Sequence, residues 1–588
     1  MASSSGNAAG VPTRTFYGRS AKSGDCSARD ILNRICAGDD CSDIDLSEDS
    51  DEEYLTSEQP PPDPEEKSSD DEGEESMSGG ACASSTVDCG QWKKELLSGN
   101  PGLFSEEFSE PGDLDTPLGF FRKFVTVDMM DSLTEQTNIY STQKMGECVA
   151  TTRAELEQFL GIYLQMGLVQ MPSVRCYWEN GTRYAPICDV MSRNRFKRLM
   201  QSIHFVNNCD VAQEDKNDKV WKLRPWISSL QCNFAQVEQE ELNSVDEIMV
   251  AFTGRSNLKQ YLPNKPTPWG FKLWGRAGTT GILYQFEVYQ GQSKKKYEHG
   301  LGGGTVLQMC SLIPENKNFK VAADNFFSSI DLAAELQKKG IYYVGTLRQN
   351  RLQDCKLMTE KELRKEGRGS FDYRVNTARS IAIVRWYDSR AVSLVSNYLS
   401  VEPVETVRRW DRKEKKHIEI SRPHIVGAYN SFMGGIDLHN YLVSLYKYCI
   451  KSRRWYLYIF YHTVMIAVVN AWNLHRRHSK QLHMKPVKLR VFIADVADSL
   501  LKAEKNVRGR PSSLPCPTPK RRKRAGASRT PEFDVRKDGV GHFPLVSEKR
   551  QRCKNCSPHD KFSFVACCKC NVYLCLNKER NCFYDFHK

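Results

Sequence analysis

The spacing of apolar residues between about residues 242 and 350 constrains the fold most, because the helical period before it gives way to the two-residue period of strands. Helical patterns within this stretch follow Gly304 and begin again at SSIDLAAELQKKG. The five strand-like segments are SVDEIMVAF, WGFKLWGRA, GILYQFEVYQG, KNFKVAADNF and GIYYVGTLR. Three strands, a helix, a strand, a helix and a strand form the order of an RNase H-like α/β core. We assign this core to residues 242–351.

Helical patterns dominate from about Pro101 to residue 240. The segments that carry them are PLGFFRKFVTVDMMDSLTEQTNIYS, TTRAELEQFLGIYLQMGLV and SRNRFKRLMQSIHFV. Thr152 opens the second with a Thr-x-x-Glu start signal, which is typical of a capped helix N-terminus. After the core, FDYRV, IAIVRWYD and AVSLVSN predict a β-rich insertion, and helical patterns return from about residue 427 to 505.

One apolar run, residues 455–472, has nearly the length of a membrane span. It contains His462 and Asn470 and is flanked by arginines, and the sequence offers no second span to pair with it. We therefore expect a buried core helix and no membrane partner.

The charge of the chain is divided unevenly. Residues 1–90 hold 6 Lys/Arg and 21 Asp/Glu, a net charge of −15, so the chain total of +11 leaves +26 on residues 91–588. A basic body with an acidic, apolar-poor head predicts a polyanionic partner for the body and a disordered head. The start MASSSGNAAG lacks an apolar run, so no secretory signal is expected, and the 21 cysteines are expected to be thiols or metal ligands.

Three aspartates stand where an RNase H-like core would bring carboxylates together. Asp246 lies within the first β segment, Asp324 ends the fourth, and Asp437, in MGGIDLHN, opens a helix after the insertion. Taken alone, each is expected to be a solvated or helix-capping residue. Together they offer the hard oxygen ligands that Mg²⁺ needs for phosphodiester cleavage.

The blocks around these residues resemble the piggyBac transposase family. Val245-Asp246-Glu247 followed by GRSNLKQYLPNKPTPWGFKL is similar to the family's first-aspartate block with its Pro-Asn-Lys-Pro motif. The later likenesses are AADNFFSSIDLAAEL to the second block, VGTLRQNR to a strand with a basic turn, and YNSFMGGID to the third block. The resemblance covers about residues 100–588.

This resemblance implies a DNA transposase with catalytic residues Asp246, Asp324 and Asp437, which would bind two Mg²⁺ or Mn²⁺ ions. Members of the family cut at the element ends to release a 3′ hydroxyl, close the end as a hairpin and join it to TTAA target sites. The implied partner is double-stranded DNA carrying terminal inverted repeats. A homodimer is expected because two element ends must be joined. Some members have a further acidic residue three positions past the third aspartate, where this chain has Asn440.

Basic residues supply candidate DNA contacts. Arg348 and Arg351 follow a core strand, and the resemblance places this turn near the DNA path; a solvated strand end is the alternative. Lys265 in the Pro-Asn-Lys-Pro block is a candidate of the same kind. Arg508 and Arg510, in Arg-Gly-Arg-Pro, match the core of an AT-hook that enters a narrow minor groove, although a basic linker produces this tetrapeptide by chance. The run KRRKR at residues 520–524 predicts import into the nucleus and nonspecific phosphate binding, with a solvated charge run as the alternative.

The last 48 residues hold a Cys/His cluster with the paired spacing of tetrahedral zinc sites. Seven ligands are clear, and His542 is our choice for an eighth, with Cys568 and His559 as competitors. We predict two Zn²⁺ ions in a cross-braced module, which resembles the family's Cys-rich domain that binds element ends. A protein-binding finger of the RING or PHD type is the alternative. The predicted ligands are His542, Cys553, Cys556, Cys567, Cys570, Cys575, Cys582 and His587.

Gly302-Gly303-Gly304 lacks the Lys-Ser/Thr of a nucleotide-binding loop and predicts a plain turn.

The regions expected are disordered acidic residues 1–95, a helical dimerisation and DNA-binding domain at 96–241 and 449–505, the catalytic core at 242–351 and 421–448, the β-rich insertion at 352–420, a basic linker at 506–540 and the zinc-binding domain at 541–588. An active transposase is the leading hypothesis. A domesticated relative serving as a chromatin or transcription factor, and a zinc-dependent ubiquitin ligase, are the alternatives.

Overall fold

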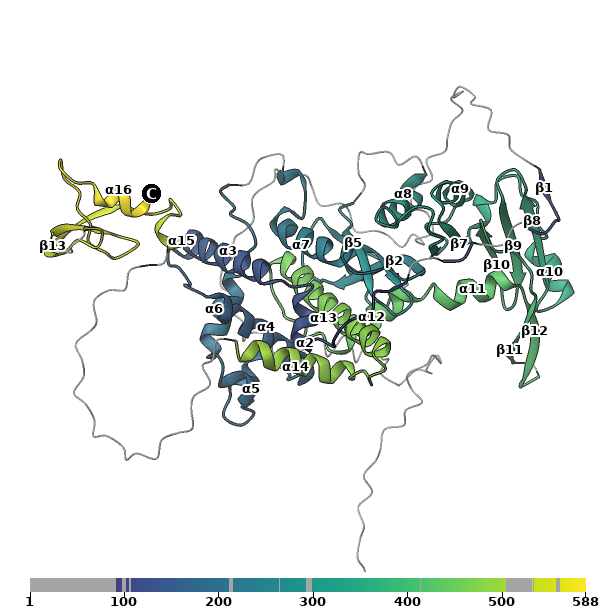
Figure 1. The fold of residues 1–588 in the computed structure, drawn as a ribbon, viewed down its shortest axis with the longest axis horizontal. Coiled ribbons are helices and arrows are strands. Elements are labelled where there is room, and N and C mark those ends of the chain that lie inside the picture. Colours follow the sequence, from purple (N-terminus) through teal and green to yellow (C-terminus); the bar gives the residue numbers. More distant parts are fainter. Residues whose placement is uncertain are drawn as a thin grey trace, which may run out of the picture. The chain divides into compact units, whose positions relative to one another are not determined.

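The computed structural model describes residues 91–97, 102–104, 107–210, 215–263, 265–291, 299–412, 414–503, 531, 533–556 and 561–588. Its largest sheet has ten strands, in the order β1-β8-β9-β10-β7-β6-β2-β4-β3, with β5 paired to β4. Its labelled strands lie in the right-hand half of Figure 1. The predicted acidic head lies outside the described residues up to residue 90. Residues 171–183 cluster as a separate unit and hold the 3-10 helix Val174–Tyr177.

The predicted alternation of strands and helices is present in the middle of the sheet. β2 pairs antiparallel with β4 and parallel with β6, while β6 pairs parallel with β7. The helices α8 and α9 form the two connections, before β6 and before β7. The elements are β2 (Leu242–Ala251), β3 (Lys259–Tyr261), β4 (Trp269–Gly278), β5 (Leu283–Val288), α8 (Gly300–Met309), β6 (Lys320–Ala323), α9 (Ile330–Lys338) and β7 (Tyr342–Leu347). The short β3 was not predicted.

Helices cover both faces of the sheet. Alternate strand residues face opposite sides, so Val321 and Tyr343 join the core under α8 and α9. Ala322 and Val344 join the second core, under α11 (His424–Phe432). The next helix, α12 (Gly435–Leu445), contacts β2 and β4. Nearly continuous burial of the central strands follows from this two-sided packing.

The predicted insertion is largely a continuation of the same sheet. β10 (Ala391–Ser396) pairs with β7, and β9 (Ile381–Tyr387) and β8 (Phe371–Asn376) follow outward. The sheet ends at β1 (Trp92–Lys93), inside the region expected to be disordered, because Trp92 packs against the main core. The other elements here are α10 (Glu360–Glu366) and the hairpin of β11 (Glu405–Asp411) and β12 (Lys416–Arg422).

The three consecutive glycines form part of a helix, so the prediction of a plain turn is wrong. They lie inside α8, where isolated propensity would disfavour helix. A Cβ on Gly302 would lie 2.5 Å from the Phe326 carbonyl oxygen and 2.9 Å from the Phe327 Cα. Tertiary packing therefore sets the helix, and the missing side chain lets α8 approach the loop that follows Asp324.

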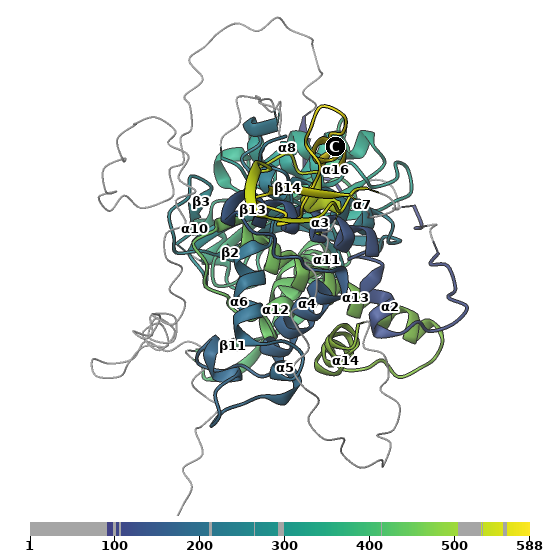
Figure 2. The same ribbon diagram turned by 90° about the vertical axis from the view of Figure 1, so that its left-hand side faces the viewer.

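The helical regions on the two sides of the core pack together. α14 contacts α4 and α2, and α13 contacts α2 and α12 (Figure 2). Thr152 caps α4 by accepting a hydrogen bond from the Glu155 amide, as its start signal predicts. The helices are α2 (Pro117–Arg122), α3 (Val127–Met145), α4 (Arg153–Leu168), α5 (Ala185–Cys188), α6 (Arg193–Ser202), α7 (Arg224–Ala235), α13 (Trp455–Gln481) and α14 (Leu489–Leu501).

The apolar run forms the first two thirds of α13. By length and composition this helix is able to cross a membrane, but 89% of its apolar window is buried inside the protein. Asn470 Oδ1 accepts a hydrogen bond of 2.9 Å from the Leu283 amide on β5, and Asn470 Nδ2 donates one of 2.7 Å to the Leu283 carbonyl. The helix is thus a core element tied to the sheet, as expected from its polar residues.

The C-terminal residues form a small module around two Cys/His groups. It contains α15 (Phe533–Arg536), β13 (Pro544–Arg552), β14 (Phe562–Cys567) and α16 (Cys582–His587), with β13 and β14 paired antiparallel. Its buried cluster consists largely of cysteines, together with Val572, Leu574 and Phe586. So small a core offers little hydrophobic stabilisation, which points to metal as the organising element.

Candidate metal-dependent active site and zinc module

Two of the predicted aspartates lie side by side where β6 ends next to the middle of the parallel strand β2. In the pairing of β2 with β6, Val245 stands opposite Ala323, so Asp246 and Asp324 are the next residues in register. Neighbouring strands are about 4.8 Å apart, and residues in register point to the same face. Asp324 Oδ1 accepts a hydrogen bond of 2.8 Å from the Phe326 amide, which fixes this carboxylate at the start of its loop.

Asp437 reaches the same place on the first turn of α12. A Cβ on Gly435 would lie 2.5 Å from the Gly278 carbonyl oxygen and 2.7 Å from the Ser244 hydroxyl. Only glycine lets the helix begin this close to β2 and β4. Ser244 precedes Asp246 by two residues on β2, so both side chains lie on the same face of the sheet. The close contact of Gly435 with Ser244 therefore places Asp437 near Asp246 and Asp324.

The electrostatics of Tyr429 and Lys265 show that the three carboxylates share one environment. Burial, with contributions from Asp324, Asp246 and Asp437, raises the pKa of Tyr429 to about 12. Burial disfavours the charge of Lys265, yet Asp246 and Asp437 help to raise the pKa of its ammonium. Both groups therefore lie within electrostatic reach of carboxylates from separate segments of the chain.

Glu247 is a fourth carboxylate that we did not predict. It forms an ion pair of 2.8 Å with Lys265, and its side chain is 15% exposed. Burial and Glu247 raise the pKa of Asp246 well above its ordinary value. Burial also raises the pKa of Asp324, whereas Lys265 and Arg348 oppose the rise. The sequence signal for Glu247 was its position next to Asp246. Because neighbouring residues of a strand point to opposite faces of the sheet, that position alone does not predict that the two carboxyl groups share a site.

This concentration of negative charge suits divalent cations. Four carboxyl groups gather here, with Lys265 paired to Glu247 and with Lys272 and Arg348 within electrostatic reach, so bound cations would relieve the repulsion that remains. The three aspartates are not a set whose ligand oxygens all lie within 4.8 Å of one another, unlike the Cys/His groups. A site for two divalent ions would not require all its ligand oxygens to lie that close together, and Asp246, Asp324 and Asp437 are the residues that would hold such ions.

The predicted basic contacts have different surroundings. Arg351 Nη1 donates to the carbonyls of Asn325, Phe326 and Ser328 at 3.2, 3.0 and 2.9 Å, so its guanidinium holds the loop after Asp324. Arg348 is exposed and lies within electrostatic reach of Asp324. The Lys265 ammonium pairs with Glu247 and lies within electrostatic reach of Asp246 and Asp437. Arg508, Arg510 and the run at 520–524 lie outside the described residues.

All eight predicted ligands of the C-terminal module gather into two groups of four. Within each group the ligand atoms lie within 4.8 Å of one another, and the groups alternate along the chain as a cross-brace requires. One group is His542, Cys567, Cys570 and His587, and the other is Cys553, Cys556, Cys575 and Cys582. The competitor Cys568 is exposed and belongs to neither group, and His559 lies outside the described residues.

The spacing within each group fits a tetrahedral zinc ion. Cys556 Sγ lies 3.8 Å from Cys575 Sγ and 3.5 Å from Cys582 Sγ. Zinc–sulfur bonds of about 2.3 Å in a tetrahedron place sulfurs about 3.8 Å apart. In the other group, His542 Nδ1 lies 3.3 Å from Cys567 Sγ and 3.5 Å from Cys570 Sγ. Both donor sets therefore match zinc in chemistry and in size.

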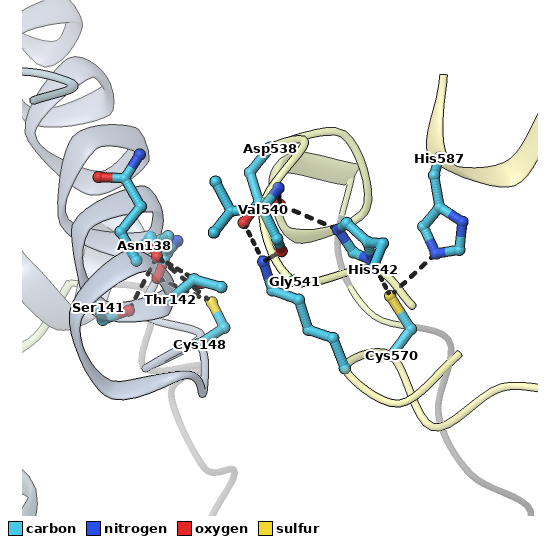
Figure 3. A network of polar contacts seen from close by, with 12 residues as sticks. Asn138, Ser141, Thr142, Cys148, Asp538, Val540, Gly541, His542, Cys570 and His587 are labelled. Carbon is cyan, nitrogen blue, oxygen red and sulfur yellow. Dashed lines mark hydrogen bonds and ion pairs between the residues drawn. The ribbon is translucent and has the colours of Figure 1, made fainter. Parts of the chain in front are cut away.

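A buried aspartate orients one of the histidines. Asp538 Oδ1 lies 2.9 Å from His542 Nε2, which directs Nδ1 of this ring toward the cysteines (Figure 3). Lys569 holds the other Asp538 oxygen at 2.5 Å. His587 contacts the Phe583 carbonyl through Nδ1, so its Nε2 faces Cys570 at 3.4 Å. Such outer partners are typical of metal-binding histidines. The module thus begins upstream of the predicted boundary at residue 541.

Comparison with known proteins agrees with these arrangements. Residues 116–472 match the family model described as Transposase IS4. The human piggyBac transposable element-derived protein 3 is 30% identical over 508 residues, which cover 84% of this chain and 81% of that protein. Human piggyBac transposable element-derived protein 2 is 30% identical over 476 residues, covering 79% and 77%. This chain belongs to the piggyBac transposase family.

The piggyBac fold extends over most of the chain. A cryo-EM structure titled as a piggyBac transposase synaptic complex with hairpin DNA aligns with 78% of this chain and 95% of its own, with a TM-score of 0.58. The two sequences are 20% identical, so this likeness is one of fold. The piggyBac membership predicted from the aspartate blocks is confirmed.

Proposed function

We propose that this protein is a DNA transposase that cuts DNA at element ends with two Mg²⁺ or Mn²⁺ ions held by Asp246, Asp324 and Asp437. The observation that carries the proposal is that Asp246 and Asp324 lie in register on neighbouring strands. The first turn of α12, which contains Asp437, lies beside them. The strand order and directions around them support an RNase H-like catalytic core. Family membership supports the reaction class.

The residues of the chain would divide the work. Asp246, Asp324 and Asp437 would hold the ions, and Lys265 would balance the charge of the neighbouring Glu247. Bound ions supply activation of the attacking water or 3′ hydroxyl and stabilisation of the leaving oxygen. Arg351 would keep the loop after Asp324 in place while DNA enters. Arg348, exposed next to Asp324, is positioned to contact a phosphate.

The further steps follow from the family. The protein would close the excised end as a hairpin and join it to TTAA sites. It would act as a homodimer, since two ends must be held together, and the neighbour determined with hairpin DNA is titled as a synaptic complex. The basic run at residues 520–524 would direct it to the nucleus.

The C-terminal module would bind two Zn²⁺ ions and contact the element ends. Its interleaved ligand groups and the Asp538–His542 pair support the zinc assignment. Zinc binding would contribute about 10 kcal/mol or more per site to folding of the module. DNA binding by residues 533–588 in the presence of zinc would distinguish it from a protein-binding finger of the RING or PHD type.

A domesticated DNA-binding protein is the second candidate. The names of the human relatives describe proteins derived from transposable elements. Such a protein would bind DNA and regulate chromatin or transcription without cutting. The three aspartates in one environment favour the enzyme.

The test is a cleavage assay with the full-length protein. The substrate is an end-labelled duplex in which a terminal inverted repeat stands next to TTAA, with Mg²⁺. The expected product is a hairpin, absent with EDTA and absent for Asp324→Asn, which is expected to bind the duplex like wild type. Binding without cleavage by the wild-type protein would favour the domesticated candidate.

A further inference from the structure

Two exposed aromatic rings lie against each other where β3 pairs with β4. Tyr261 and Trp269 stand directly opposite in the register and are 49% and 45% exposed. Their ring centroids are 4.5 Å apart, with an angle of 38° between the ring planes. Cross-strand aromatic pairs stabilise hairpins, so this contact alone has a structural explanation.

One ammonium lies next to this pair, and another basic residue precedes the pair in the sequence. The Lys259 ammonium lies 4.8 Å from the centroid of the Trp269 ring, and Arg255 is exposed just before β3. Surfaces that take unpaired nucleic-acid bases combine exposed aromatic faces with basic side chains that attract the phosphates. The composition of the patch therefore fits a single-stranded segment of DNA.

A short turn ties the pair to the carboxylates. Leu262 donates to the Pro268 carbonyl at 2.8 Å and closes the turn, in which Lys265 forms its ion pair with Glu247. The four Cα–Cα steps from Lys265 to Trp269 span at most about 14 Å. A base stacked on this patch would thus lie next to the turn whose Lys265 pairs with Glu247.

Strand geometry gives the length of DNA between the two places. Gly275 on β4 pairs with Asp246, and Trp269 lies six residues away along the same strand. Six residues correspond to about 20 Å of strand. A DNA strand that keeps its duplex stacking covers that distance in about six nucleotides, at roughly 3.4 Å each, and an unstacked strand covers it in fewer.

We propose that Tyr261 and Trp269, together with Lys259, form an aromatic platform that stacks an unpaired base of the DNA strand whose phosphate lies at the carboxylates. The inference rests on the proposed function in one respect, that the ligand is DNA. The platform adds recognition of an unpaired base close to the cut. The protein would therefore bind opened DNA ends more tightly than intact duplex.

The experiment compares two DNA probes in EDTA, where cleavage does not interfere. One is a blunt 20-base-pair duplex, and the other carries a six-nucleotide single-stranded extension containing 2-aminopurine, whose fluorescence falls when it stacks. The variants of the full-length protein are Trp269→Ala, Tyr261→Ala and the conservative Trp269→Phe. Trp410→Ala is the matched control, because Trp410 is 53% exposed on another hairpin, opposite His417.

Wild type and Trp410→Ala are expected to bind the extended probe more tightly than the blunt one and to quench its fluorescence. Trp269→Ala is expected to weaken binding of the extended probe by about 5- to 150-fold, the range for loss of one stacked base, and to lose the quenching. Its affinity for blunt duplex should change less than about twofold, and Trp269→Phe should recover most of the loss.

Equal losses on both probes, or no loss on either, would overturn the platform. So would equal affinity of the wild type for the two probes. Failure of the proposed function has a different signature, in which the wild type stacks the extension but cuts no DNA in Mg²⁺. A wild type that binds neither probe would overturn both proposals.

Discussion

Gly435 sets how closely α12 approaches the sheet, so an added methyl group there tests whether Asp437 acts through its position. The new Cβ would lie 2.5 Å from the Gly278 carbonyl oxygen, whereas ordinary contacts begin at 3.4 Å. The first turn of α12 would have to move by roughly 0.9 Å. Misplacement of a catalytic group by about 1 Å costs on the order of 100-fold in rate.

Gly435→Ala is therefore expected to cut labelled element ends about 100-fold more slowly and to bind them like wild type. Overpacking should also lower the free energy of unfolding by about 1–3 kcal/mol. Gly434→Ala is the matched control, because residue 434 has φ −83° and a Cβ there meets nothing within 4 Å. Cleavage by Gly435→Ala at the wild-type rate, or equal slowing by Gly434→Ala, would refute the reasoning.

Three further predictions follow from the same contacts. Asp324→Asn is expected to abolish nicking and leave the Kd for DNA unchanged in gel-shift titrations; detectable nicking at the wild-type rate would exclude its catalytic role. Asp538→Ala should weaken zinc binding by about 10–100-fold in competition with a chelator, because His542 loses its orienting partner, whereas Cys568→Ala should leave it unchanged. Arg348→Ala should reduce the slope of log Kd against log salt concentration by about 0.9 in titrations with duplex DNA, and an unaltered slope would place its charge away from phosphate.

The central strands and the carboxylates were predictable because their signals are local. Apolar alternation marked β2, β4, β5, β6 and β7, and the aspartates stand at positions fixed by strand order. The two Cys/His groups were predictable for the same reason, since the paired spacing of their members is visible in the sequence. His542 completes its group as chosen.

The features that the sequence did not predict depend on contacts between segments far apart in the chain. The helical state of Gly302 is set by the backbone at Phe326, which its own propensity does not reveal. Trp92 gains a place in the sheet by packing on a core formed far along the chain. Glu247 joins the carboxylates through Lys265, and Arg351 is held by three carbonyls that sequence spacing does not bring near it.

The most direct test of the account is the binding of Mn²⁺ to the full-length protein, followed by electron paramagnetic resonance with cleavage-resistant DNA present. The account predicts a pair of bound, magnetically coupled ions in the wild type and loss of that signal in Asp246→Asn, Asp324→Asn and Asp437→Asn. Unchanged Mn²⁺ binding in these three variants would contradict the claim that their carboxylates form one metal site.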